Sequence, residues 1–222
     1  MAWCNTCLVV ALALAPACAA AQALDPPPTR FEAEIRAFEA ADHERLPPAG
    51  GIVFIGSSSI KNRTTVAADF PCLPILNRGF GGSTLADVVY YEDRILLSYH
   101  PRLVVLYAGD NDIEMGRSPE RVARDYRAFV AKLRSGSPHA RLVFVSIKPS
   151  PARLAVIDRA REANRLIRAE VGRDSLTSYV DVFTPMLKPS GRPRPELFLA
   201  DSLHMNRAGY LLWRARLAPV VH

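Results

Sequence analysis

Residues 52–59 read IVFIGSSS: four apolar, largely β-branched residues, then one glycine and three serines. Four such apolar residues in a row favour a strand buried on both faces, because a half-solvated strand would alternate with polar residues. A second run of this kind, Leu103–Tyr107 (LVVLY), is followed by Ala-Gly-Asp-Asn-Asp at residues 108–112. Buried strands that end in small and polar residues are typical of parallel sheets, whose functional loops follow the strands.

Further strands and helices alternate around these two runs. The strand candidates are 52–55, 74–77, 103–107, 142–147 and 178–182. Apolar residues recur at helical spacing in the segments 31–46, 85–97, 119–134, 151–171 and 207–216. This alternation predicts an α/β fold, in which a mostly parallel five-stranded sheet carries helices on both faces.

The composition is that of an ordinary globular domain. The 222 residues are 49% apolar and 23% charged, and no repeat or low-complexity linker divides them. Disorder along the whole chain is excluded, because disordered chains are poorer in apolar residues. The formal net charge is +6, but the arginines are scattered and form no dense basic run. We therefore expect a solvated basic surface and no nucleic-acid partner.

The N-terminus has the layout of a secretory signal peptide. Residues 8–21 are uncharged and mostly apolar, and Ala21-Gln-Ala23 supplies a small-x-small cleavage site. The apolar run of about 14 residues is too short for a membrane span, which needs ~20. We expect removal of residues 1–23 and a periplasmic or secreted product. Residues 24–222 would form a single domain, in which 24–49 are a lead-in and an N-terminal helix.

The cysteines leave one alternative for export. Cys18 could be the acylated residue of a lipoprotein, although the leucine expected three positions earlier is missing. In the mature chain Cys72 would be the one remaining cysteine, which excludes an internal disulfide and a paired-cysteine metal site. We expect Cys72 to be a small buried apolar residue.

Two segments carry residues suited to nucleophilic catalysis. A serine in Gly56-Ser-Ser-Ser59 could be a nucleophile, or it could only cap a helix. Asp201 and His204 are three residues apart, just before the last predicted helix. The carboxylate can therefore accept a hydrogen bond from the imidazole, fix its tautomer and let it take a proton from a hydroxyl group.

Two other loops could hold a negatively charged oxygen. Three glycines within residues 79–82 allow backbone N–H groups to approach a ligand closely. Neither GxGxxG nor GK[ST] is present there, so nucleotide binding is not favoured. Asn111 offers a neutral amide that can donate to an oxyanion. Asp110 and Asp112 beside it leave a metal-dependent phosphoesterase open, although no further ligands complete a metal site.

In this order, the four segments resemble the SGNH (GDSL-type) serine hydrolase and esterase family. The resemblance spans about residues 50–216 and implies a flavodoxin-like three-layer α/β/α sandwich. It implies a catalytic triad and an oxyanion hole, and it implies neither an organic cofactor nor a metal. The implied residues are Ser58, Asp201 and His204 for the triad, and Ser58, Gly82 and Asn111 for the oxyanion hole.

One position departs from the family pattern, since Ser57 stands where the family usually has aspartate. Ser57 and Ser59 therefore remain rival nucleophiles to Ser58. The expected activity is hydrolysis of carboxylic esters with short acyl groups, through an acyl-enzyme, on a small-molecule or acylated-carbohydrate substrate. A non-catalytic exported binding protein on the same fold is the alternative. Lys148, after the fourth strand, would be a substrate contact or a solvated loop lysine.

Overall fold

The computed structural model describes Met1 and residues 25–222. The expected signal peptide and the alternative lipid-bearing Cys18 lie outside the described residues, apart from Met1. Five strands form one parallel sheet in the order β2-β1-β3-β4-β5, which is the flavodoxin-like order. The strands are β1 (Ile52–Gly56), β2 (Ile75–Gly79), β3 (Leu103–Tyr107), β4 (Arg141–Val145) and β5 (Thr177–Val180). The predicted fold class is confirmed.

The two central strands determine where loops can meet. β1 lies between β2 and β3, and its register pairs Gly56 with Gly79 on one side and with Tyr107 on the other. The loops that follow these three strands therefore begin side by side at one edge of the sheet. The chain also reverses its direction of winding between β1 and β3, and α/β folds bind ligands at such a switch point.

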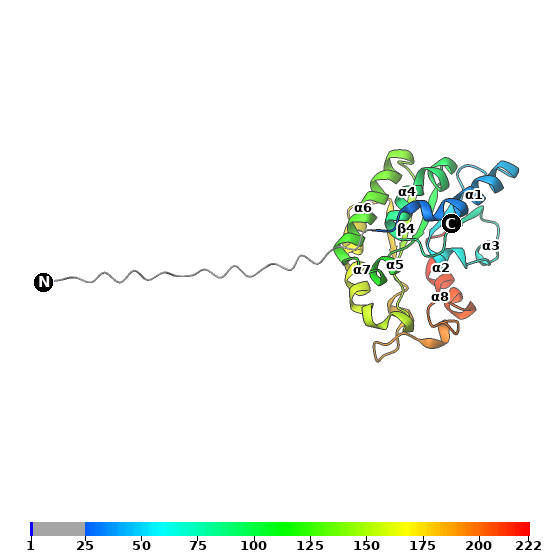
Figure 1. Cartoon of the computed structure of the whole chain (residues 1–222). Helices are drawn as coiled ribbons and strands as arrows, with labels where there is room; N and C mark the ends of the chain where they lie inside the picture. The colour runs from blue at the N-terminus through cyan, green and yellow to red at the C-terminus, as the bar shows by residue number, and fades with distance from the viewer. Residues whose placement is uncertain (2–24) are drawn as a thin grey trace.

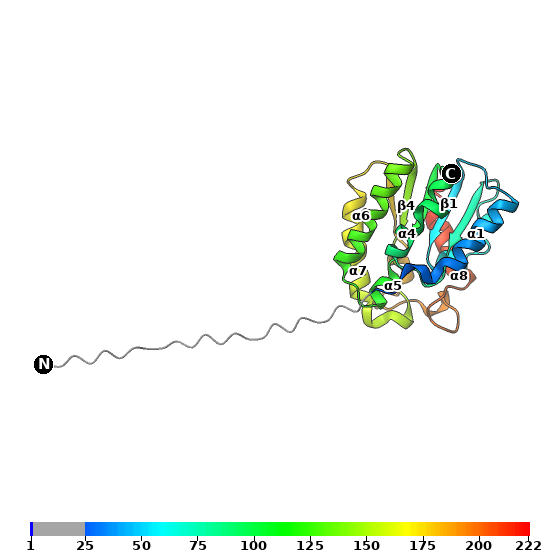
Figure 2. The same cartoon turned by 45° about the horizontal axis from the view of Figure 1, so that its top comes forward.

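Helices cover both faces of the sheet (Figure 1, Figure 2). One face packs against α1 (Glu32–Glu44), α4 (Leu85–Ile95), α6 (Pro119–Gly136) and α7 (Ile157–Val171). The other face packs against α2 (Ser58–Lys61), α3 (Val66–Asp69) and α8 (Arg207–Leu217). Alternate residues of β1 enter the two cores: Val53 and Ile55 face the first, whereas Ile52 and Phe54 face the second. None of the described helices is both long and apolar enough to span a membrane.

The structure differs from the sequence predictions at one helix and at Cys72, among other places. The helix predicted over 151–171 is divided into a 3₁₀ helix, η3 (Pro151–Val156), and α7, because Arg153 has non-helical φ and ψ of −112° and 28°. Cys72 was expected to be buried, and that prediction is wrong. It is exposed and has a φ of +69°, in the turn between α3 and β2.

Glu92 on α4 is a buried acid outside the predicted site. Its side chain is fully buried, and within residues 25–222 neither carboxyl oxygen has a hydrogen-bond partner. The nearby ammonium group of Lys132 on α6 instead pairs with Asp93 at 2.6 Å. Burial therefore raises the pKa of Glu92 to about 9, against a usual value of 4.5. Glu92 is protonated in the folded protein at neutral pH.

Candidate active site

A sharp turn after β1 presents Ser58. Gly56 has a φ of +138°, and a Cβ there would lie 1.8 Å from the carbonyl oxygen of Tyr107, so only glycine fits. The same carbonyl accepts the N–H of Ser57 at 3.0 Å. Ser57 and Ser59 are buried, whereas Ser58, the first residue of α2, is partly exposed. Of the three serines, Ser58 is the one that a substrate can reach.

The loop before α8 brings His204 and Asp201 to Ser58. Nε2 of His204 lies 3.2 Å from Oγ of Ser58, and Nδ1 lies 2.7 Å from Oδ2 of Asp201. The other carboxylate oxygen accepts the N–H groups of Leu203 and His204, each at 2.9 Å. The hydrogen bond from His204, and then these two, lower the pKa of Asp201 to about 2. An ionised carboxylate, an imidazole and a hydroxyl group therefore form one hydrogen-bonded row.

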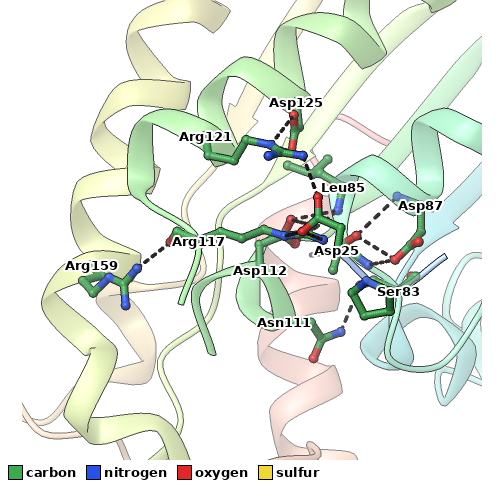
Figure 3. Close-up of polar contacts among 12 residues, drawn as sticks. Asp25, Ser83, Leu85, Asp87, Asn111, Asp112, Arg117, Arg121, Asp125 and Arg159 are labelled. Atoms are coloured by element: carbon green, nitrogen blue, oxygen red, sulfur yellow. Dashed lines mark hydrogen bonds and ion pairs between the residues drawn. The ribbon is translucent and has the colours of Figure 1, made fainter. Parts of the chain in front are cut away.

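Gly82 and Asn111 follow β2 and β3 at the same edge of the sheet. Gly82 is exposed and has a φ of +79°. Within residues 25–222 neither its N–H nor that of Ser58 has a backbone acceptor, so both can donate to a ligand. Asn111 is the second residue of the short helix α5 (Asp110–Glu114), and Figure 3 shows its amide nitrogen directed toward the Ser83 carbonyl, at 2.9 Å. This uses one of its two N–H hydrogens and leaves the other free.

A residue that the sequence analysis missed holds the other end of the Asn111 amide. One guanidinium nitrogen of Arg153 donates to Oδ1 of Asn111 at 2.8 Å, and another lies 2.9 Å from Oδ2 of Asp110. Lys148 donates to the same oxygen of Asp110 at 3.2 Å, and its side chain is 1% exposed. Lys148 is therefore a buried partner of Asp110, and the expectation of a solvated loop lysine is wrong.

Charges compensate burial around Asp110. Burial alone would raise the pKa of its carboxyl group, but Lys148 and Arg153 outweigh that effect and hold the pKa below its usual value. Burial lowers the pKa of Lys148, and Asp110 opposes that shift. Asp110 is thus an ionised carboxylate whose Oδ2 pairs with both cations, whereas within residues 25–222 its Oδ1 is buried without a hydrogen-bond partner.

The carboxylate of Asp112 has different partners from that of Asp110. Its carboxylate accepts from Arg117 at 2.9 Å and from the N–H of Leu85, at the start of α4, at 3.1 Å (Figure 3). Burial is the largest effect on Asp112 and raises its pKa to about 6. Asp110 and Asp112 therefore face separate cationic partners, which does not favour a shared divalent metal ion. Among residues 25–222, no three His, Cys, Asp or Glu side chains are grouped so that they could hold one.

Comparisons with known proteins identify a matching family and structures with the same fold. A family model of GDSL-like lipases and acylhydrolases matches residues 61–212. The match begins just after Ser58, and it contains Gly82, Asn111, Asp201 and His204. No curated protein sequence matches the chain.

Solved structures share the fold at low sequence identity. A Streptococcus pneumoniae protein named for platelet activating factor has a TM-score of 0.77 and 19% identity, covering 87% of this chain and 94% of its own. A GDSL-like lipase from Bacteroides thetaiotaomicron has a TM-score of 0.72 and 19% identity, covering 85% and 97%. The acetylxylan esterase Axe2 from Geobacillus stearothermophilus has a TM-score of 0.61 and 13% identity, covering 78% and 94%.

These structures establish a shared fold, and the family model adds a sequence match over more than half of the chain. The match ends within α8 and therefore includes β2 to β5, together with the loops that follow β2 and β3. The chain belongs to the GDSL-like lipase/acylhydrolase family.

Proposed function

We propose that this chain is an exported serine esterase, which hydrolyses carboxylic esters through an acyl-enzyme on Ser58. The observation that carries the proposal is the row of contacts from Ser58 through His204 to Asp201, at 3.2 and 2.7 Å. A base within hydrogen-bond reach of a hydroxyl group, itself oriented by a carboxylate, is the arrangement that activates serine. Family membership supports hydrolysis of an acyl bond in general terms.

Acylation begins when Oγ of Ser58 bonds to the ester carbonyl carbon and its proton passes to Nε2 of His204. The carbonyl π electrons move to oxygen, and the resulting oxyanion accepts hydrogen bonds from the N–H groups of Ser58 and Gly82 and from the amide of Asn111. Asp201 holds Nδ1–H and stabilises the imidazolium ion. When the tetrahedral intermediate collapses, the alcohol leaves with the proton from Nε2, and the acyl group stays on Ser58.

Deacylation repeats these steps with water as the nucleophile. His204, now neutral, takes a proton from water as the water oxygen bonds to the acyl carbon. The same donors hold the second oxyanion, and its collapse returns the proton from Nε2 to Oγ of Ser58 and releases the acid. None of these steps requires a metal ion or an organic cofactor.

The proposed substrates are small or carbohydrate-linked esters with short acyl groups. The sequence contains no long apolar insertion that could form a lid over an extended acyl chain. Axe2, which shares the fold, is an acetylxylan esterase, and acetylated xylan oligosaccharides are therefore suitable test substrates. Export through a signal peptide over residues 1–23 would bring the protein to such extracellular substrates.

Hydrolysis of p-nitrophenyl acetate tests the proposal, with Ser58→Ala as the variant and Ser57→Ala and Ser59→Ala as matched controls. The proposal predicts that wild-type protein turns over and that Ser58→Ala loses at least about 10³-fold in kcat. If activity persists in Ser58→Ala and disappears in one of the two controls, the serine replaced in that control is the nucleophile. A wild-type protein inactive toward acetyl, butyryl and octanoyl esters would instead favour a non-catalytic binding protein.

A further inference from the structure

We propose that Arg153 is a positioning residue of the oxyanion hole. It holds Asn111 so that the amide N–H, and not the amide carbonyl, faces the substrate, and it adds positive charge behind that amide. This inference rests on the ester hydrolysis proposed above. It concerns a residue outside the four segments that suggested the site, since Arg153 lies in η3, after β4.

The two ends of the Asn111 amide are fixed by opposite kinds of partner. Nδ2 donates to the carbonyl oxygen of Ser83 at 2.9 Å, and Oδ1 accepts from Arg153 at 2.8 Å. Rotating the amide by half a turn would place its oxygen against the Ser83 carbonyl and its NH₂ group against the guanidinium group, so both contacts would become repulsive. The pair of contacts therefore selects one orientation and leaves one N–H free.

The position of Arg153 is itself well determined. Its side chain is 16% exposed, and its guanidinium group forms an ion pair with the Asp110 carboxylate at 2.9 Å. Asp110 is in turn held by the buried ammonium group of Lys148 at 3.2 Å. Arg153 has non-helical φ and ψ within η3, and its side chain contacts both Asp110 and Asn111 on α5.

Charge adds to this geometric effect. Two cations, Arg153 and Lys148, share one buried carboxylate, that of Asp110. Two further acids lie nearby: Glu114 is half exposed and pairs with Arg153 at 3.7 Å, and Asp201 acts on the charge of Lys148. Asp110 alone therefore faces both cations directly, and the positive charge of Arg153 stabilises a developing oxyanion more than a neutral ester carbonyl. The contribution of Arg153 should consequently appear in kcat and leave KM nearly unchanged.

Steady-state kinetics of the purified protein with p-nitrophenyl acetate test the inference. Arg153→Met should lower kcat roughly 10²-fold, the size expected when a catalytic group is displaced by about 1 Å, with KM almost unchanged. Arg153→Lys keeps the charge without the fork of donors and should recover part of the loss. The matched control is Arg159→Met, because Arg159 on α7 donates to the carbonyls of Gly116 and Arg117 and not to Asn111. Its kcat should equal that of the wild type.

A double-mutant cycle separates positioning from a general structural effect. If Arg153 acts mainly by orienting Asn111, Arg153→Met should lower kcat far less than 10²-fold in an Asn111→Ala background, where only the effect of its charge remains. Losses that multiply in the double variant would overturn the inference, and so would a wild-type kcat in Arg153→Met. Near-ultraviolet circular dichroism checks the fold, and Arg153→Gln replaces Arg153→Met if the latter does not fold.

The same series distinguishes failure of the inference from failure of the proposed function. If Ser58→Ala keeps wild-type turnover, the proposed function fails, and the inference about Arg153 falls with it. If Ser58→Ala is inactive and Arg153→Met retains full kcat, the serine esterase stands and only the inference is wrong.

Discussion

Replacing Glu92 with glutamine should stabilise the protein, and the size of the effect depends on pH. The change removes an ionisable carboxyl group with little change in side-chain shape. Glu92 is fully buried on α4, and among the described residues its carboxyl oxygens have no hydrogen-bond partner. The folded protein therefore keeps Glu92 protonated under conditions in which the unfolded chain would ionise it.

The magnitude follows from the two pKa values of Glu92, which are 4.5 when the group is free and about 9 in the fold. Between them the unfolded chain releases a proton that the folded protein retains, so the free energy of unfolding falls as pH rises through this window. At pH 7 the solution is about 2.5 pH units above the lower value, which corresponds to about 3 kcal/mol at ~1.4 kcal/mol per unit. Glutamine does not titrate, so Glu92→Gln should recover most of that free energy.

Urea denaturation from pH 4 to pH 9 measures the effect. The free energy of unfolding of Glu92→Gln should match that of the wild type near pH 4 and exceed it by about 3 kcal/mol at pH 7. Glu44→Gln, on the exposed end of α1, is the control and should stay within about 0.5 kcal/mol of the wild type at every pH. A difference that does not vary between pH 4 and pH 9 would contradict the raised pKa and show that Glu92 is ionised in the fold at neutral pH.

Three further predictions concern the site. Asn111→Ala removes one oxyanion donor and should lower kcat for p-nitrophenyl acetate roughly 10²- to 10³-fold. An unchanged kcat in folded protein would show that Asn111 is not an oxyanion donor. Asp201→Asn keeps an oxygen for the backbone N–H groups but presents NH₂ to Nδ1 of His204, so kcat should fall by up to about 10⁴-fold; near-normal kcat would mean that another group orients the imidazole. Gly56→Ala places a Cβ 1.8 Å from the Tyr107 carbonyl oxygen and should lower the melting temperature and abolish turnover; wild-type melting would contradict the strained turn.

The sheet could be predicted because its central strands are buried on both faces. The run Leu103–Tyr107 coincides with β3, and the run 52–55 lies within β1 (Ile52–Gly56). Such strands consist almost wholly of apolar residues, which stand out in any sequence. The short helices α2, α3 and α5 were not predicted, because four or five residues are too few to show helical periodicity.

Ser58, His204 and Asp201 are in contact because the loop before α8 reaches the turn that follows β1. Gly82 and Asn111 lie in the loops that follow β2 and β3 at the same edge of the sheet. His204 and Ser58 are in contact at 3.2 Å although 146 positions separate them in the chain. Their catalytic roles stay predictions until activity is measured. Arg153 escaped prediction because its neighbours repeat with helical spacing, whereas in the structure the backbone departs from helical geometry at Arg153, and its side chain contacts Asn111. Cys72 was misplaced because its turn exposes a residue type that is usually buried.

The most direct test of the central claim is to trap the acyl-enzyme on Ser58. Protein mixed with excess p-nitrophenyl acetate and quenched in acid would be digested, and the peptide that contains Ser57, Ser58 and Ser59 would be sequenced by mass spectrometry. We predict an acetyl group on Ser58, which accumulates further in Asp201→Asn if deacylation is slowed more than acylation. An acetyl group on Ser57 or Ser59, or steady turnover of a Ser58→Ala variant, would contradict this prediction.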